Sequence, residues 1–430
     1  METRILKVPL AGQGEDALGW WATAPDGTRD LTTWEVPSAP PSADAADPLA
    51  PLREAAHLLR TTDTPVAFPT ETVYGLGADA TRSAAVRGIF SAKGRPSDNP
   101  LIIHVSDLTM LRRLLSPSAT PTTDPIPAIY HPLIQQFWPG PLTILLPLPT
   151  PSPLAPEVTA HLPTVGARLP ASALARTLIA LAGAPLAAPS ANASTRPSPT
   201  TAAHVRDDLR GAIALVLDGG PCAVGVESTV VDGLCAPPAV LRPGGVGIEA
   251  IRAVGGPWAD VERAYRDGGS EEEGGGATPR APGMKYKHYS PRARVVLYEA
   301  SSGGPGLEGD VLARVGGGMV LGFIRTGGWA VAGGLRHAGG GEAGVVGGEG
   351  MGIVVTEGSL LGEEGGDVAR LLDVDLGRDV KGVAHGLFAA LRELDRLGAD
   401  VIFVEGVSDG DDIAAAVMNR LRKAASEIRT

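Results

Sequence analysis

The sequence predicts two domains of mixed α and β structure, an α+β domain followed by a smaller parallel α/β domain. A chain of 430 residues is long enough to build two hydrophobic cores. Between residues 51 and 265, short apolar runs and a few amphipathic helices follow one another without regular alternation, which favours a sheet of mixed strand directions. After residue 292, apolar runs alternate with helical patterns, as in a parallel sheet covered by helices.

The first 50 residues, with a Pro/Ala/Ser run near residues 37–51, predict an irregular N-terminal arm. A helix is expected at 52–60, where apolar residues share one face. The elements expected after it are strands at 65–68, 101–105, 144–146, 164–170, 215–218, 227–232 and 239–242, and helices at 84–92, 108–115 and 172–183. A Pro/Thr-rich insertion at 116–127 follows the helix expected at 108–115.

Residues 266–291 predict a linker, because their first half is acidic and rich in glycine. The sequence therefore divides into an arm at 1–50, a larger domain at 51–265, this linker, and a C-terminal domain at 292–430. In the last domain we expect strands at 295–298, 320–324, 353–356 and 401–405, and helices near 383–397 and 411–426. Much of the glycine-rich stretch 303–366 is expected to be loose loop.

Bulk composition restricts the class of protein. A net charge of −11 argues against a large basic surface for nucleic acid. Cys222 and Cys235 are the two cysteines, and their spacing does not match a zinc site. The N-terminus lacks the apolar core of a signal peptide, and the most apolar stretch, 177–188, is too short to cross a membrane. We therefore expect a soluble, cytoplasmic protein.

The segment 69–105 carries the strongest chemical signal. It opens with PTETVYGLGADA, where Gly75 and Gly77 let the backbone approach a ligand closely, and it ends in a loop that holds Lys93 and Arg95. The chain has only six lysines among 37 basic residues, so a lysine in this loop suggests a specific role for a compact charge. Cations on a rigid turn beside a strand end suit a polyphosphate.

Other polar residues allow two interpretations each. Ser190 and Asn192, on a proline-flanked turn, could hold phosphates opposite Lys93 and Arg95, or could simply form the turn. Arg168 lies in an apolar strand and needs an anionic partner, which is either a protein carboxylate or a ligand carboxylate. A lone histidine in an apolar strand, such as His104, is more often a core residue than a ligand contact.

Several common sites are not indicated. GLGADA mimics a dinucleotide fingerprint, but no acidic residue follows at a suitable second strand end. The sequence contains no Walker A motif, no Ser/His/Asp arrangement and no His/Cys cluster with metal-ligand spacing.

Seven segments, taken in order, are more specific than any one of them: PTETVYGLGADA, KGRPSDNPLIIHV, WPGPLTILL, VGARLP, APSANASTRPSPT, ESTVVD and LRPGG. Together they closely resemble the YrdC-like threonylcarbamoyl-AMP synthases. The segment APGMKYKHYSP and the domain after it resemble the long form of this family, and the arm at 1–50 with the Pro/Thr-rich insertion resembles its eukaryotic, fungal version. The resemblance implies a YrdC-like mixed twisted sheet with a concave active site, and a smaller Rossmann-like parallel α/β domain at the C-terminus.

The resemblance also implies the reaction: L-threonine, bicarbonate and ATP, with Mg²⁺ on the phosphates, give threonylcarbamoyl-AMP and pyrophosphate. The product would pass to a partner complex that makes threonylcarbamoyladenosine beside the anticodon of tRNA. By similarity, the signature residues around the nucleotide are Lys93, Arg95, Ser190 and Asn192. Further contacts to ATP are expected from Asn99, Thr164, Ser198, Arg242 and Tyr286. Threonine is expected to be held by Thr72, His104, Arg168, Ala188 and Ser228. The resemblance names no protein ligands for Mg²⁺.

Two alternatives of other classes remain at this point. An RNA-binding module of the same fold is one, although the negative net charge counts against stable nucleic-acid binding. Carbamoyl transfer in metal-centre maturation is the other, but it would need zinc-finger and acylphosphatase-like segments that the sequence lacks. We also expect residues 279–291, which combine three prolines with tyrosines and lysines, to cover the nucleotide as a lid.

Overall fold

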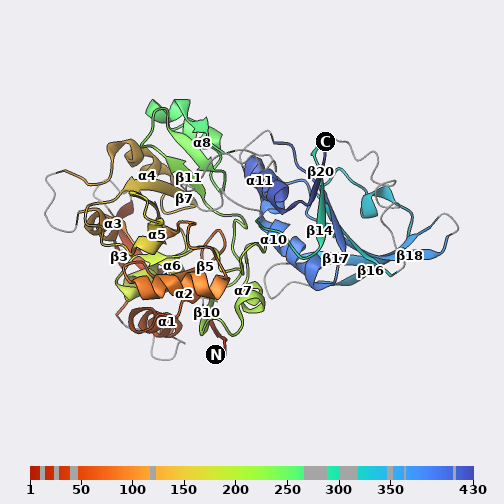
Figure 1. Ribbon diagram of the computed structural model, residues 1–430, viewed down its shortest axis with the longest axis horizontal. Helices are drawn as coiled ribbons and strands as arrows, with labels where there is room; N and C mark the ends of the chain where they lie inside the picture. Colours follow the sequence, from red (N-terminus) through yellow and green to blue (C-terminus); the bar gives the residue numbers. More distant parts are fainter. Residues whose placement is uncertain are drawn as a thin grey trace.

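The computed structural model describes residues 1–9, 15–23, 29–38, 47–116, 123–265, 288–300, 318–345, 352–362, 365–409 and 413–430. These residues form two bodies side by side, an N-terminal body up to residue 265 and a C-terminal body from residue 288 (Figure 1). The mixed α/β architecture agrees with the predicted fold class. The residues between the two bodies, 266–287, lie outside the described part, so the linker boundaries stay a prediction.

The N-terminal body is built on an eleven-stranded sheet with the order β1-β10-β4-β5-β9-β6-β8-β7-β11-β12-β13. Its strands are β1 (Arg4–Lys7), β4 (Val66–Pro69), β5 (Tyr74–Asp79), β6 (Ile102–His104), β7 (Leu142–Pro147), β8 (Thr164–Arg168), β9 (Leu186–Ala187), β10 (Leu215–Asp218), β11 (Thr229–Asp232), β12 (Ala239–Arg242) and β13 (Glu262–Arg263). Parallel and antiparallel pairs both occur, for example β6 with β8 and β4 with β5. The predicted mixed sheet is confirmed.

Helices of the N-terminal body are α1 (Ala50–Thr61), α2 (Ser83–Lys93), α3 (Leu108–Leu115), α4 (His131–Phe137), α5 (Pro156–Thr159), α6 (Ala173–Ala182), α7 (Ala202–Leu209) and α8 (Ile248–Arg252). The apolar face predicted for α1 is the face it buries. Helix α6 begins where the Ser172 side chain accepts a hydrogen bond from the Ala175 amide, and ends at Gly183 in the left-handed conformation. The sequence analysis did not anticipate α4 and α7.

The expectation of an irregular N-terminal arm is wrong for its described part. Strand β1 lies at the sheet edge and pairs in parallel with β10 over four residues. Strands β2 (Trp20–Thr23) and β3 (Arg29–Glu35) form an antiparallel hairpin. This hairpin is fixed to α6, because the buried Trp34 indole donates to the Thr177 hydroxyl at 2.9 Å. The β1–β10 pairing and the Trp34–Thr177 contact join residues far apart in the chain, so local sequence patterns did not reveal them.

The C-terminal body has a seven-stranded sheet with the order β16-β17-β18-β15-β19-β14-β20. Its strands are β14 (Arg294–Tyr298), β15 (Val320–Arg325), β16 (His337–Val345), β17 (Val354–Leu361), β18 (Asp367–Asp375), β19 (Val401–Glu405) and β20 (Glu427–Arg429). The five strands from β18 to β20 are parallel, as predicted. Strands β16 and β17 extend this sheet antiparallel, so the expectation of loose loop over 303–366 is wrong where the structure describes it.

Helices α10 (Val380–Arg396) and α11 (Ala414–Ala424) lie between the C-terminal sheet and the N-terminal body (Figure 1). Val73 and Val226 of the N-terminal body belong to the hydrophobic cluster that these helices form with their sheet. The approach is close at Gly225, where a Cβ atom would lie 2.4 Å from the carbonyl oxygen of Ala384 on α10. Continuous apolar packing therefore joins the two bodies.

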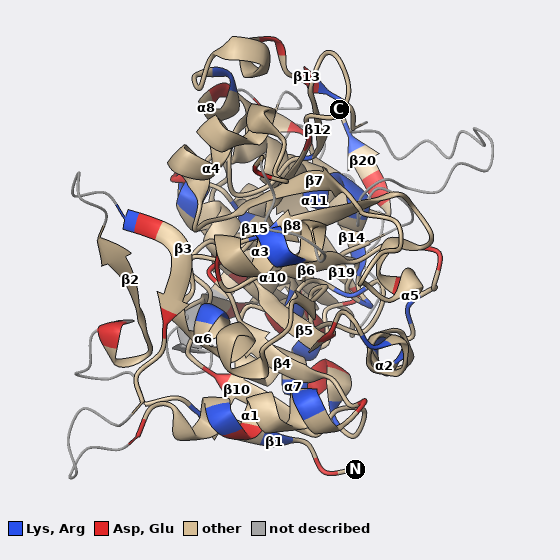
Figure 2. Ribbon diagram, turned by 90° about the vertical axis from the view of Figure 1, so that its left-hand side faces the viewer, with Lys and Arg blue, Asp and Glu red and all other residues tan. Residues whose placement is uncertain are grey.

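Charged residues are interspersed on the side of the molecule that Figure 2 presents, with Lys and Arg next to Asp and Glu. No helix within the described ranges combines the length and the apolar character needed to span a bilayer.

Candidate active site

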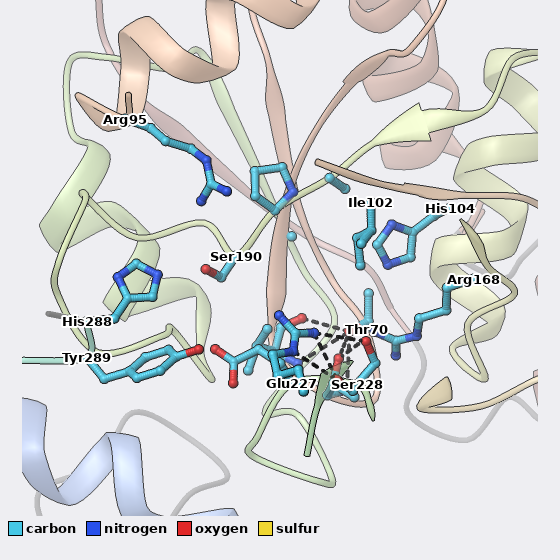
Figure 3. A pocket seen from close by; sticks show the side chains of 16 residues that line it. Thr70, Arg95, Ile102, His104, Arg168, Ser190, Glu227, Ser228, His288 and Tyr289 are labelled. Carbon is cyan, nitrogen blue, oxygen red and sulfur yellow. Dashed lines mark hydrogen bonds between the residues drawn. The ribbon is translucent and has the colours of Figure 1, made fainter. Parts of the chain in front are cut away.

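A pocket opens where the β4–β5 turn, β6, β8, the loop after β9 and the start of β11 meet residues 288–289 of the C-terminal body (Figure 3). Its lining residues are Thr70, Thr72, Val73, Gly75, Arg95, Ile102, His104, Arg168, Ala188, Pro189, Ser190, Glu227, Ser228, Arg242, His288 and Tyr289. In Figure 3, Arg95 and Ser190 lie on one side and His104 and Arg168 on the other. Polar and cationic side chains from distant parts of the chain therefore converge on one cavity.

Many residues singled out from the sequence lie in this pocket, although their roles stay predictions. Those that line it are Thr72, Arg95, His104, Arg168, Ala188, Ser190, Ser228 and Arg242. The predicted residues that do not line it are Lys93, Asn99, Thr164, Asn192 and Ser198. Tyr286 lies outside the described residues.

Lys93 is buried behind the pocket and holds the Ser190–Asn192 turn in place. Its ammonium donates to the backbone carbonyls of Ser190 and Asn192, and lies 3.4 Å from the Asn192 Oδ1. The Ser190 hydroxyl donates to the same Oδ1 at 2.6 Å. Burial, followed by the nearby Arg95, lowers the pKa of Lys93 well below its ordinary value. Three oxygen acceptors nevertheless match the three N–H groups of an ammonium, so the protonated form fits this site.

Two guanidinium groups of the pocket are oriented by backbone carbonyls. Arg95 donates to the Pro100 carbonyl at 3.2 Å, and Arg242 donates to the Ser228 carbonyl at 2.8 Å. Burial lowers the pKa of Arg95 to about 10, so the group stays charged at neutral pH. A carbonyl orients a guanidinium without neutralising it, and Arg95 therefore keeps its charge available for an anion. Arg242 also interacts with the Glu227 carboxylate.

Arg168 has a protein carboxylate as its partner. Its Nη2 lies 2.5 Å from the Glu71 Oε1, and both side chains are largely buried. The Nη1 donates to the Thr72 hydroxyl at 2.9 Å and the Nε to the Gly140 carbonyl at 3.1 Å. A guanidinium has five N–H groups, so these contacts leave room for a second carboxylate. The ion pair and the ligand site, which were alternatives at the sequence level, are thus compatible.

His104 is an uncharged residue of the pocket. Burial, followed by the charge of Arg168, holds the pKa of its imidazole well below the ordinary value. Its Nδ1 is buried and has no hydrogen-bond partner among the described residues. A neutral ring nitrogen facing a ligand cavity suits a hydroxyl or amine better than a carboxylate.

Four charged or aromatic residues of this region were not proposed as ligand contacts from the sequence. Glu71 belongs to the TET segment, and Glu227 opens the EST segment that the sequence also allowed as a simple turn. His288 and Tyr289 come from the end of the proposed lid, and both line the pocket. The Tyr289 hydroxyl points toward the Glu227 carboxylate in Figure 3. The dense composition of 279–291 was a signal for this segment, and it had singled out Tyr286 as the expected nucleotide contact and His288 as part of the lid.

The donor atoms of the pocket do not form a dedicated metal site. No group of three or more His, Cys, Asp or Glu side chains among the described residues could hold a metal ion. Mg²⁺ in nucleotide sites is commonly held by substrate phosphates with one or two carboxylates. The cationic pocket therefore fits an ion that arrives with a polyphosphate.

Comparison with known proteins agrees with this description. The Sua5_yciO_yrdC family, described as "Telomere recombination", matches residues 59–244, and the family described as "Threonylcarbamoyl-AMP synthase, C-terminal domain" matches residues 246–426. A threonylcarbamoyl-AMP synthase of Schizosaccharomyces pombe is 44% identical over 88% of this chain and 88% of its own length. One from Pyrococcus abyssi is 42% identical over 84% of this chain and 89% of its own length.

The solved structure of P. abyssi Sua5 complexed with L-threonine superposes with a TM-score of 0.67 at 37% identity, covering 88% of this chain and 95% of that one. The match spans the pocket and both bodies. The chain therefore belongs to the threonylcarbamoyl-AMP synthase family, in the long form that carries the C-terminal domain.

Proposed function

We propose that this protein joins L-threonine, bicarbonate and ATP into threonylcarbamoyl-AMP, with release of pyrophosphate. The observation that carries the proposal is the division of the pocket. Residues expected to contact ATP, such as Arg95 and Ser190, lie on one side, and residues expected to contact threonine, such as His104 and Arg168, lie on the other (Figure 3). Such a pocket can hold two substrates with their reacting groups near each other.

On the threonine side, Arg168 binds the substrate carboxylate, while Thr72 and Ser228 supply hydroxyl groups. Once neutral, the threonine amine attacks bicarbonate, with loss of water, or carbon dioxide, with loss of a proton, and forms a carbamate. The carbamate oxygen then attacks the α-phosphorus of ATP, the bond to pyrophosphate breaks, and the mixed anhydride forms. The carbamate is itself the nucleophile, so the protein needs no nucleophilic serine or cysteine. Its task is to position the substrates, balance their charge and exclude water.

On the nucleotide side, Arg95 and Arg242 neutralise phosphate charge, and the Ser190–Asn192 turn, held by Lys93, shapes the phosphate site. We assign Asn99, Thr164 and Ser198 to the outer part of the same site. Mg²⁺ would enter on the phosphates and supply further charge neutralisation. The product would pass to a complex that transfers the threonylcarbamoyl group to tRNA in the cytoplasm.

Pyrophosphate release from the purified protein tests the proposal. We expect release only when ATP, L-threonine and bicarbonate are all present. Release that is unchanged when threonine is omitted would overturn the proposal. An RNA-binding module would instead bind tRNA tightly and release no pyrophosphate under the same conditions.

A further inference from the structure

Helix α10 of the C-terminal body contacts a buried carboxylate of the N-terminal body, that of Asp208 on α7 (Figure 1). The Asp208 side chain has no solvent exposure. Arg392 on α10 donates to both of its oxygens, from Nη1 at 3.1 Å and from Nη2 at 2.7 Å. Two parallel hydrogen bonds of this kind give an ion pair a fixed geometry. The ion pair therefore sets the position of α10 relative to α7.

The same two side chains also hold the backbone of one loop, residues 193–198. The Asp208 Oδ2 accepts a hydrogen bond from the Ala193 amide at 3.1 Å. Arg392 donates to the Pro197 carbonyl from the Nη2 that also contacts Asp208. The 193–198 loop is thus held at its start and near its end by one ion pair that joins the two bodies.

The 193–198 loop supports residues that are expected to contact ATP. The side-chain amide of Asn192 donates to the Arg196 carbonyl at 3.0 Å. The backbone amide of Ser194 donates to the Lys93 carbonyl at 2.8 Å. Ser198 is itself the last residue of the loop. A shift of the loop backbone would therefore disturb two signature residues and the Ser198 hydroxyl together.

Other contacts join this loop to the C-terminal body, but they are weaker. The Arg196 Nη2 lies 2.7 Å from Asp395 on α10, and the Ser290 amide donates to the Thr195 carbonyl at 2.8 Å. The Arg196 side chain is 25% exposed, whereas that of Arg392 is 6% exposed. Water competes more strongly with an exposed ion pair than with a buried one. Arg392 therefore provides the main link between α10 and the loop.

We propose that Arg392 is a positioning residue of the active site, through which the C-terminal body holds the 193–198 loop in the arrangement that binds ATP. The effect should be specific to one substrate, because His104 and Arg168, expected to contact threonine, lie on β6 and β8 and not on this loop. This inference rests on the proposed function for the assignment of the loop to ATP.

The test uses the full chain and two variants of the ion pair. Arg392→Met leaves Asp208 as a buried charge without its main partner, so stability in urea should fall together with ATP affinity. Adding Asp208→Asn removes that charge and keeps an oxygen for the Ala193 amide, so stability should largely recover. The ATP affinity should not recover in the double variant, because the Pro197 carbonyl still lacks its donor from α10.

Arg325→Met is the matched control. Arg325 forms an ion pair of 2.8 Å with Asp373, and the two side chains are 12% and 2% exposed. Both residues belong to the sheet of the C-terminal body. The control should therefore lose stability as Arg392→Met does, while the 193–198 loop keeps its contacts.

Calorimetry with ATP–Mg²⁺ gives the first comparison. Both Arg392 variants should bind about tenfold to a hundredfold more weakly than the unaltered protein, and the control should stay within about threefold. The threonine KM for pyrophosphate release should stay within about threefold in every variant, because its binding groups are not displaced.

Hydrogen exchange of residues 190–200 reports on the loop without any need for catalysis. The Ala193 and Ser194 amides are hydrogen-bonded, to Asp208 and to the Lys93 carbonyl. They should exchange about tenfold faster in both Arg392 variants than in the Arg325→Met control.

Three results would overturn the inference. One is a loop that exchanges at the rate of the control. Another is an ATP affinity that recovers together with stability in the double variant, which would make Arg392 a purely structural residue. The third is an equal rise of the threonine and ATP KM values. An unaltered protein that releases no threonine-dependent pyrophosphate would instead refute the proposed function, and calorimetry and hydrogen exchange would still decide the role of Arg392.

Discussion

Replacing Arg168 separates its ion pair with Glu71 from its proposed role in binding the threonine carboxylate. The two side chains are only 3% and 12% exposed. Breaking a buried ion pair by removing one partner costs about 3–5 kcal/mol, because the remaining charge stays unpaired. We therefore expect Arg168→Met to lower the free energy of unfolding by about that amount. Arg168→Met combined with Glu71→Gln should recover most of it, since no buried charge is left without a partner.

The catalytic effect should not recover in the double variant. The loss of a charge-assisted contact to the substrate carboxylate costs about 1.5–3 kcal/mol, which corresponds to a rise of roughly 10- to 150-fold in the threonine KM. The ATP KM should change little, because Arg95 and Arg242 are untouched. Glu71→Gln alone serves as a control, since its amide oxygen can still accept from Arg168.

Urea unfolding gives the stability of each variant, and initial rates of pyrophosphate release with varied threonine or ATP give the KM values. The reasoning fails if the double variant regains the threonine KM of the unaltered protein, because Arg168 would then serve only the ion pair. It also fails if the ATP KM rises as much as the threonine KM.

Three further predictions concern other residues of the N-terminal body. Lys93→Arg should cost about 2–4 kcal/mol in kcat/KM, because a planar guanidinium cannot match the three acceptors around Nζ; unchanged kinetics would contradict this. His104 is neutral when folded, so its contribution to stability should fall by about 1.4 kcal/mol per pH unit below pH ~6.5; urea unfolding of His104→Asn should lack this slope. Gly77→Ala should lower stability by about 1–3 kcal/mol, because its Cβ would lie 2.6 Å from the Phe68 ring, whereas Gly75→Ala meets nothing nearer than 3.4 Å; equal unfolding midpoints would refute this difference.

The sequence predicted best what depends on residues close together in the chain. Apolar periodicity gave α3 with its observed bounds and the buried face of α1. The pairing of β1 with β10 joins residues about 210 positions apart, so no local pattern could indicate it. The hairpin of β2 and β3 was also not predicted. It is stabilised by the contact of Trp34 with α6, which joins residues far apart in the chain.

The candidate site shows the same limit. Motif order predicted most of the pocket-lining polar residues, because each motif places its residues through its own turn or strand. The partner of Arg168 could not be fixed from the residues alone: a protein carboxylate is the more usual partner of a buried arginine, but a ligand carboxylate also suits it. Arg420 of α11 forms an ion pair with Glu227, 193 positions away. Sequence patterns cannot predict such a contact, because it depends on how the two bodies pack against each other.

The pocket also shows how an acidic protein builds a cationic site. The chain has a net charge of −11, yet Arg95, Arg168 and Arg242 line one cavity. Arg95 and Arg242 are each oriented by a backbone carbonyl, which fixes a guanidinium without cancelling its charge. The Glu227 carboxylate lines the pocket and forms an ion pair with Arg420 of the C-terminal body. The sign of the site therefore depends on which oxygens hold each arginine, a property that net charge cannot reveal.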